Sequence, residues 1–113
     1  MIEELVIQYL NSVMDVPAYG EVPDFVTDAD TYIVVDKSGS QRENRVDSAV
    51  VIAYSYAPTK FEAAELNEAV KEALLNIDSL DTISAVRLNS DGNATDDQIK
   101  NYRYQCVTVI TPF

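Results

Sequence analysis

Hydrophobic residues near the start of the chain recur at every third or fourth position, the spacing of one face of an α-helix. These apolar positions are Ile2, Leu5, Val6, Tyr9, Leu10, Val13 and Met14. Because proline disfavours helical backbone at the residue before it, we expect this helix to end before Pro17. Residues 16–30 contain Gly20 and Pro23 and predict a loop or a short edge segment.

Four runs rich in β-branched and aromatic residues predict strands. They cover residues 31–36, 48–56, 83–88 and 101–111. In the second run Val50, Ile52 and Tyr54 alternate with other residues, and we expect these three side chains to face the helices. The alternate positions, such as Val51, are also apolar, which leaves open a second covering of this strand by a partner subunit.

The polar segments between these strands predict loops. Residues 37–47 hold a single glycine and predict a long hairpin connection rather than a two-residue turn. Residues 89–97 predict a loop between the last two strands. Between the two hairpins, Thr59 followed by Glu62 is typical of a helix N-terminus, with the Thr59 side chain capping the first turn. An apolar stripe continues from there, and we expect the helix to end near Asn76.

The order of elements predicts one α+β domain over residues 1–113. An αββαββ order with hairpin connections indicates a two-layer domain, in which a mostly antiparallel four-stranded sheet carries both helices on one face. The other face would then be exposed in the monomer. Because solvent disfavours an exposed apolar patch, this arrangement points to oligomerisation.

Charge and composition narrow the possible functions. Eight basic side chains against 19 acidic ones give a net charge of −11, which opposes stable binding to nucleic acid or to anionic membranes. The absence of histidine removes the commonest general base and metal ligand. We therefore expect no enzyme activity and no cofactor. No basic residue precedes Lys37, so we expect no export signal and a cytoplasmic location.

Few residues suggest chemistry of their own. One cluster of oxygen-bearing side chains is typical of a calcium-binding loop, and it consists of Asp91, Asn93, Thr95, Asp96 and Asp97. A calcium loop needs glycine where Asp96 stands and glutamate where Tyr102 stands, so a solvated turn is the favoured interpretation, with cation binding left open. Cys106 alternates within a strand and has no histidine to activate it, which indicates a core or interface thiol rather than a nucleophile.

Basic residues gather where the chain is otherwise acidic. Residues 1–36 carry eight acidic side chains and no basic one, whereas Lys37, Arg42 and Arg45 lie together in the hairpin connection. Such segregated poles favour docking between copies, although a solvated loop tip is the alternative. The tyrosines suit either the core or an interface, because they provide a large contact area. The interface candidates are therefore Lys37, Gln41, Arg42, Glu43, Asn44, Arg45, Tyr54, Tyr56, Tyr102, Arg103 and Tyr104.

Nearly the whole chain resembles the tail terminator, or tail completion, proteins of long-tailed bacteriophages. The resemblance lies in the order and length of its segments and in the turn-forming residues between them. The resembling segments include Asp15-Val16-Pro17-Ala18-Tyr19, Tyr32-Ile33-Val34-Val35-Asp36, Asp47-Ser48-Ala49, Tyr56-Ala57-Pro58-Thr59 and Tyr102-Arg103-Tyr104-Gln105. The resemblance implies a minor tail protein without catalysis, which forms a ring, commonly a hexamer, at the head-proximal end of the tail tube.

Such a ring would stop tube growth and join the tail to the head. The implied partners are other copies of the chain, the tail tube protein and the head-tail connector proteins. The implied locations are the host cytoplasm during assembly and the virion tail. Residues 37–47, 48–56 and 101–111 match the segments that make subunit and tube contacts in that family.

Two other classes remain open. A small acidic inhibitor, or DNA mimic, would line carboxylates along one face and bind a nucleic-acid enzyme in a salt-dependent way. A monomeric ligand-binding domain would instead hold one enclosed pocket between the helices and the sheet.

Overall fold

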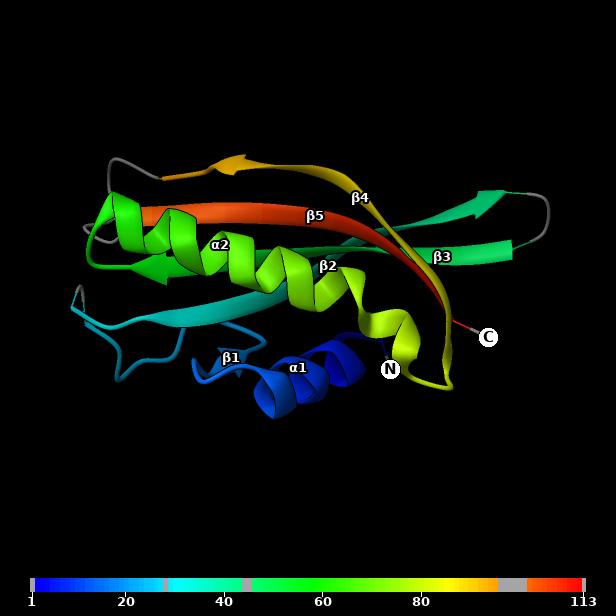
Figure 1. Ribbon diagram of the computed structural model, residues 1–113, viewed down its shortest axis with the longest axis horizontal. Coiled ribbons are helices and arrows are strands. Elements are labelled where there is room, and N and C mark those ends of the chain that lie inside the picture. The colour runs from blue at the N-terminus through cyan, green and yellow to red at the C-terminus, as the bar shows by residue number, and fades with distance from the viewer. Residues whose placement is uncertain (1, 28, 44–45, 96–101, 113) are drawn as a thin grey trace.

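The computed structural model describes residues 2–27, 29–43, 46–95 and 102–112, with the backbone alone at residues 41–43 and 46. These residues form an α+β fold, which confirms the predicted class (Figure 1). The elements, in chain order, are α1 (Ile2–Val13), β1 (Ala18–Tyr19), β2 (Tyr32–Glu43), β3 (Val46–Ala57), α2 (Lys60–Leu75), the 3-10 helix η1 (Ile77–Ser79), β4 (Ile83–Asn93) and β5 (Tyr102–Pro112).

The sheet has five strands, in the order β1-β2-β3-β5-β4, so the prediction of four strands is wrong. The four long strands run antiparallel to their neighbours, as expected. The fifth strand, β1, pairs in parallel with β2 through Ala18 and Tyr19, which makes the sheet mixed. A strand of two residues is too short to produce an alternating pattern, and this explains why the sequence indicates only a loop or an edge segment there.

A polar side chain of α1 holds β1 in place. The Asn11 amide nitrogen donates to the Ala18 carbonyl oxygen at 3.1 Å, and the Asn11 amide oxygen accepts from the Ala18 amide at 2.9 Å. On the side of β2, the Ile33 amide donates to the Pro17 carbonyl oxygen at 2.9 Å. Asn11 thus satisfies the backbone of β1 as a neighbouring strand would.

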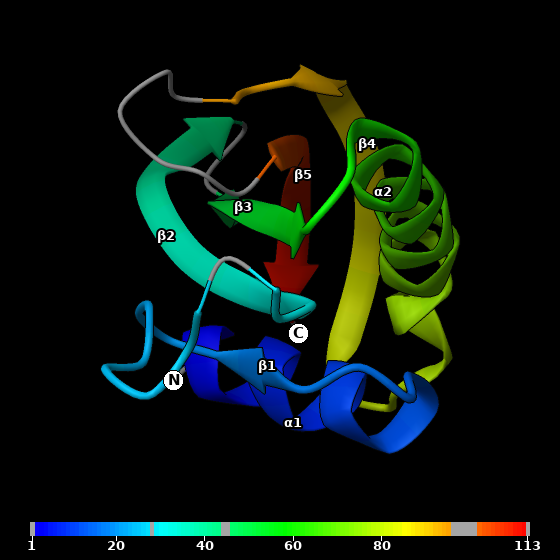
Figure 2. The same ribbon diagram turned by 90° about the vertical axis from the view of Figure 1, so that its left-hand side faces the viewer.

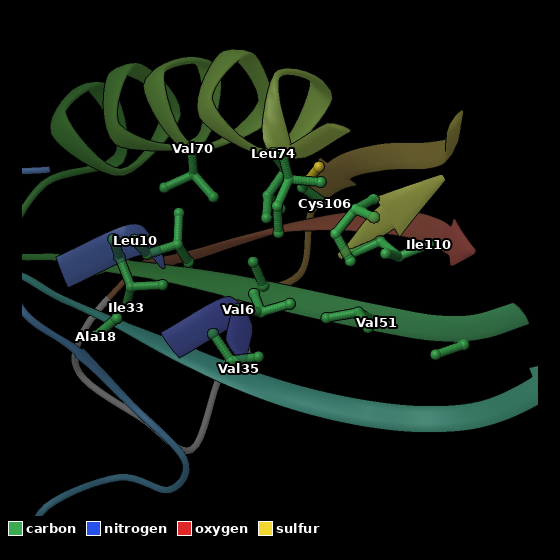
Figure 3. Packing of buried hydrophobic residues seen from close by; sticks show 14 of the residues in the cluster. Val6, Leu10, Ala18, Ile33, Val35, Val51, Val70, Leu74, Cys106 and Ile110 are labelled. Atoms are coloured by element: carbon green, nitrogen blue, oxygen red, sulfur yellow. The ribbon is translucent and has the colours of Figure 1, made fainter. Parts of the chain in front are cut away.

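Both helices cover the same face of the sheet, and the main core lies between the helices and the sheet (Figures 2 and 3). Val6 and Leu10 of α1 and Val70 and Leu74 of α2 pack against side chains of β2, β3 and β5. The buried sheet side chains in this core are Ala18, Ile33, Val35, Ala49, Val51, Ala53, Ile83, Cys106 and Ile110. The Tyr9 hydroxyl also donates to the Ala73 carbonyl oxygen at 2.8 Å, which joins the two helices.

The face of β3 that meets the helices is the opposite of the predicted one. Val51 is buried in the core, whereas Val50, Ile52 and Tyr54 point to the other face and are half-buried. Both sets of β3 residues are largely apolar, so periodicity alone did not distinguish them. The smaller set faces α2, where a helix must approach the sheet closely.

The ends of α2 agree with the sequence analysis. The Thr59 hydroxyl oxygen accepts from the Glu62 amide at 3.2 Å, and Thr59 is the N-cap residue. The helix ends at Leu75, with Asn76 as its C-cap. Within the described parts of the chain, neither helix has the length and apolar character that crossing a membrane requires.

The predicted long hairpin connection is instead paired strand. β2 and β3 continue to the pair Glu43 and Val46, which leaves two residues, 44 and 45, between them. Residues 37–43 and 46–50, which we call the arm, project beyond the helices at one end of the molecule (Figure 1). The molecule measures 43 × 25 × 23 Å, with its long axis along the sheet strands. Polar residues on both faces of a strand look like a loop in the sequence, which explains the error.

The predicted loop over residues 89–97 is also mostly strand. β4 extends to Asn93, which pairs with Tyr104, and Asp91 pairs with Cys106. Beyond β4, the Ala94 amide donates to the Arg103 carbonyl oxygen at 2.8 Å. Asp96 and Asp97 of the cation hypothesis lie outside the described residues.

Candidate functional site

The structure separates the interface candidates into three groups. The first group lies on the arm. Lys37 is exposed there, and the last three residues of β2 are Gln41, Arg42 and Glu43. Asn44 and Arg45 lie outside the described residues. The arm therefore carries two described basic positions, Lys37 and Arg42, away from the core.

The second group lies on the sheet face opposite the helices, which we call the outer face. The Arg103 guanidinium carbon lies 4.8 Å from the centre of the Tyr54 ring and 6.0 Å from that of Tyr56. Its Nη1 atom donates to the Tyr56 hydroxyl at 3.4 Å, and its Nε atom donates to the Ala94 carbonyl oxygen at 2.9 Å. These contacts hold the guanidinium over the tyrosine rings, a favourable position for a cation.

Sequence reasoning missed the residue that completes this cluster, which is Tyr32. Its ring stacks on that of Tyr56 with centres 4.6 Å apart and planes 8° from parallel. The two residues are direct neighbours across β2 and β3, so the correct strand register would have revealed the pair. Burial raises the pKa of the Tyr32 hydroxyl, and the neighbouring Tyr56 and Asp30 raise it further.

The third group, Tyr102 and Tyr104, lies on the side of β5 that faces the helices, opposite the outer face. Tyr104 pairs with Ser55, whose side chain is buried on the helix side, whereas Arg103 pairs with Tyr56. Strand alternation therefore divides the predicted tyrosine surface between the two faces of the sheet.

The outer face is less exposed than the sequence predicts. Val107 and Val109 are buried there, and Val50, Ile52 and Tyr54 are half-buried. Val26, from the segment before β2, packs with the Tyr32 and Tyr56 cluster and covers one end of this face. The large apolar side chains that are exposed among the described residues are Val13, Val22, Phe25, Phe61, Leu88 and Tyr102.

Asp91, the first residue of the cation hypothesis, contacts α2. Its Oδ2 atom lies 3.3 Å from the Lys71 ammonium and accepts from the Asn67 amide nitrogen at 3.4 Å. The Lys71 ammonium also donates to the Glu68 Oε1 atom at 2.9 Å. This bond and the one to Asp91 raise the pKa of the Lys71 ammonium. Asn93 accepts instead from the Thr95 amide and hydroxyl. Among the residues that the structure describes, no three histidine, cysteine or acidic side chains come together to hold a metal.

Cys106 is buried in the main core, as one of the two sequence interpretations expects. Burial raises the pKa of its thiol to about 11, and the negative charge of Asp91 adds to this shift. The thiol therefore stays protonated near neutral pH, and a protonated buried thiol is a poor nucleophile.

This burial predicts a stability loss at alkaline pH. Below pH 9 the thiol holds its proton in both the folded and the unfolded protein; between pH 9 and 11 only the unfolded thiol releases it, so folding weakens. A shift of two pKa units corresponds to on the order of 2 kcal/mol. Urea denaturation at pH 8 and at pH 11 measures this loss in the free energy of unfolding.

The Cys106→Ala variant is the control, since it keeps Tyr9 and Tyr32, whose pKa values burial also raises. We expect its stability to fall less than that of the wild type over the same pH range. Equal losses in the two proteins would show that Cys106 is not the buried acid responsible.

An open hollow of about 160 Å³ lies at the base of the arm, where the two chain ends meet the hairpin. Its wall combines apolar and charged side chains, and it consists of Ile2, Lys37, Ser40, Asp47, Ser48, Ala49 and Pro112. Beside it, the Ser48 and Thr111 hydroxyl oxygens lie 2.7 Å apart in a hydrogen bond. The hollow could not be predicted from local sequence because it brings Ile2 and Pro112, from opposite ends of the chain, together with residues of the arm.

No family model matches the chain, and no curated protein matches its sequence. The geometry and charge of the arm, the outer face and the hollow are therefore the evidence that bears on its function.

Proposed function

We propose that the protein is a structural subunit of a phage or prophage tail, which assembles into a ring at the head-proximal end of the tail tube. There it stops growth of the tube and joins the tail to the head connector. It acts without catalysis and without a cofactor. The arm is the observation that carries this proposal.

The arm suits an assembly role because most of it lies outside the core of the monomer, to which Ala49 at its base belongs. β1 pairs with β2 only at Ile33 and Val34, so the edge of β2 over residues 36–43 has no neighbouring strand among the described residues. A long paired arm with an open edge gains stability when another subunit covers it. The described arm has no net charge, with Lys37 and Arg42 against Glu43 and Asp47, whereas the rest of the chain is strongly acidic. A second copy therefore meets less charge repulsion at the arm than elsewhere on the molecule.

The net charge of −11 also fits a component through which DNA must pass. A ring of acidic subunits repels the phosphate backbone, so DNA would travel through it without binding. The same charge fits an acidic inhibitor of a nucleic-acid enzyme, and the experiment below separates the two functions.

The test is assembly on tail tubes. We expect light scattering and negative-stain images to show closed rings of about six subunits, in solution or on the ends of purified tail tubes. Lys37→Glu with Arg42→Glu should abolish the rings and leave the fold intact. Lys60→Glu, at an exposed lysine at the start of α2, is the control and should assemble normally.

A protein that neither forms rings nor binds tube ends would contradict the proposal. Salt-sensitive capture of a nucleic-acid enzyme by such a monomer would favour the inhibitor instead.

A further inference from the structure

An acidic loop lies at the opposite end of the molecule from the arm. Residues 20–31, which we call the acidic loop, connect β1 to β2 at the end where α2 begins, whereas the arm projects from the other end (Figure 1). This loop carries four acidic residues and no basic one. Its Glu21 and Asp24 side chains are exposed. The two ends of one molecule therefore differ in charge.

Two large apolar side chains of the acidic loop are exposed, Val22 at 48% and Phe25 at 73%. The loop backbone around them is held in place. The Val26 amide donates to the Pro23 carbonyl oxygen, and Val26 packs on the outer-face cluster. The Phe25 ring touches the Tyr19 ring edge-on, with centres 6.0 Å apart, and is otherwise open to solvent. The loop thus presents an exposed aromatic ring, and the exposed Glu21 and Asp24 side chains lie in the same loop.

The hollow at the base of the arm is large enough for an aromatic ring. Its volume of about 160 Å³ is close to that of an engineered apolar cavity that binds benzene, about 150 Å³. Ile2, Ala49 and Pro112 provide an apolar wall for a ring. One basic side chain, Lys37, and one acidic side chain, Asp47, also line the hollow.

We propose that the acidic loop of one copy docks on the arm of a second copy. The Phe25 ring enters the hollow, and Glu21 and Asp24 face Lys37 of the arm. Because the two surfaces lie at opposite ends of the molecule, the contact is head to tail and repeats from copy to copy. This inference rests on the proposed ring, for which it names the contact between subunits.

Phe61 is the other strongly exposed phenylalanine, at 71%. It lies in the first turn of α2, directly after Lys60 and outside the acidic loop. A basic neighbour does not complement Lys37 of the arm. Phe61 therefore provides a control of equal size and equal exposure.

Disulfide trapping tests the contact. Two variants, Phe25→Cys and Ser40→Cys, are purified separately, mixed in low salt and oxidised gently; Ser40 is an exposed residue of the hollow. We expect the mixed disulfide to form at least about tenfold faster than for Phe61→Cys with Ser40→Cys, because docking raises the effective concentration of the two thiols. The buried Cys106 should not react.

A charge change supplies the second readout. Adding Lys37→Glu to the Ser40→Cys variant should slow trapping by Phe25→Cys, and 0.5 M salt should slow it as well, to roughly the rate of the Phe61→Cys control. Equal trapping of Phe25→Cys and Phe61→Cys would overturn the inference, as would trapping that ignores the charge of residue 37.

The outcomes separate this contact from the proposed function. Selective trapping with no ring formation on tail tubes would support the contact and contradict the tail function. Rings on tail tubes without selective trapping would support the function and overturn the contact.

Discussion

Replacing Leu74 with alanine should lower the free energy of unfolding by about 2–5 kcal/mol, the range for large-to-small changes in a closed core. Leu74 is fully buried, and its side chain lies between α2 and the sheet beside Cys106 and Ile110 (Figure 3). Removing three carbons there leaves a void that the strands beneath cannot fill without losing their pairing. Urea denaturation followed by circular dichroism measures the change.

Leu75→Ala is the matched control for this prediction. Leu75 is the next residue of the same helix and is only half-buried. Both substitutions replace leucine by alanine near the end of α2, so the change in helix propensity is the same. We expect Leu75→Ala to cost less than about 1 kcal/mol. Equal losses at the two positions would contradict the orientation of α2 on the sheet.

The helices could be predicted closely because their signals are local. The apolar spacing of α1 and the Thr59 cap of α2 each lie within a few residues, and both helices begin and end near the expected positions. The orientation of β3 could not be predicted in this way. Its two faces are nearly equally apolar, and only the space available under α2 selects Val51 over Ile52.

The ends of the strands depended on pairing rather than on composition. β2 continues through a polar arm and β4 through an Asp-Gly-Asn stretch, because the partner strands supply hydrogen bonds at those positions. β1 depends on a single side chain, Asn11, seven residues away from Ala18. A pattern of hydrophobic positions contains no information about a polar side chain that replaces a strand.

The candidate site was predicted in part. The sequence indicated Tyr54, Tyr56 and Arg103, which do lie together, but it grouped them with Tyr102 and Tyr104, which face the other way. The hollow and the separation of the arm from the acidic loop are properties of the folded chain. They depend on which ends of the strands meet, and no local segment encodes that.

Replacing Tyr56 with alanine should cost about 3–5 kcal/mol, as for other buried aromatic residues. Tyr56 is only 4% exposed although it lies on the face without helices, because Tyr32, Val26 and Arg103 surround it. The loss of this ring would uncover Tyr32 and remove one of the two rings that the Arg103 guanidinium contacts. Denaturation in urea measures the loss, with the folded state checked by circular dichroism.

Two further variants separate packing from hydrogen bonding at this position. Tyr56→Phe removes only the hydroxyl, whose bond from Arg103 is long at 3.4 Å, and should cost less than about 1 kcal/mol. Tyr102→Ala removes a ring that is 39% exposed and should also have a small effect. A loss for Tyr56→Ala as small as that for Tyr102→Ala would contradict a packed outer face.

The same substitution connects the outer face to the acidic loop. Val26 packs against the cluster that contains Tyr56, and its neighbour Phe25 is the residue proposed to enter the hollow of a second copy. If the cluster fixes this loop, Tyr56→Ala should increase hydrogen exchange at the Val26 amide and slow disulfide trapping at residue 25, while Tyr102→Ala should change neither. Unchanged exchange in Tyr56→Ala would show that the loop is held by its own turns, independently of the cluster beneath it.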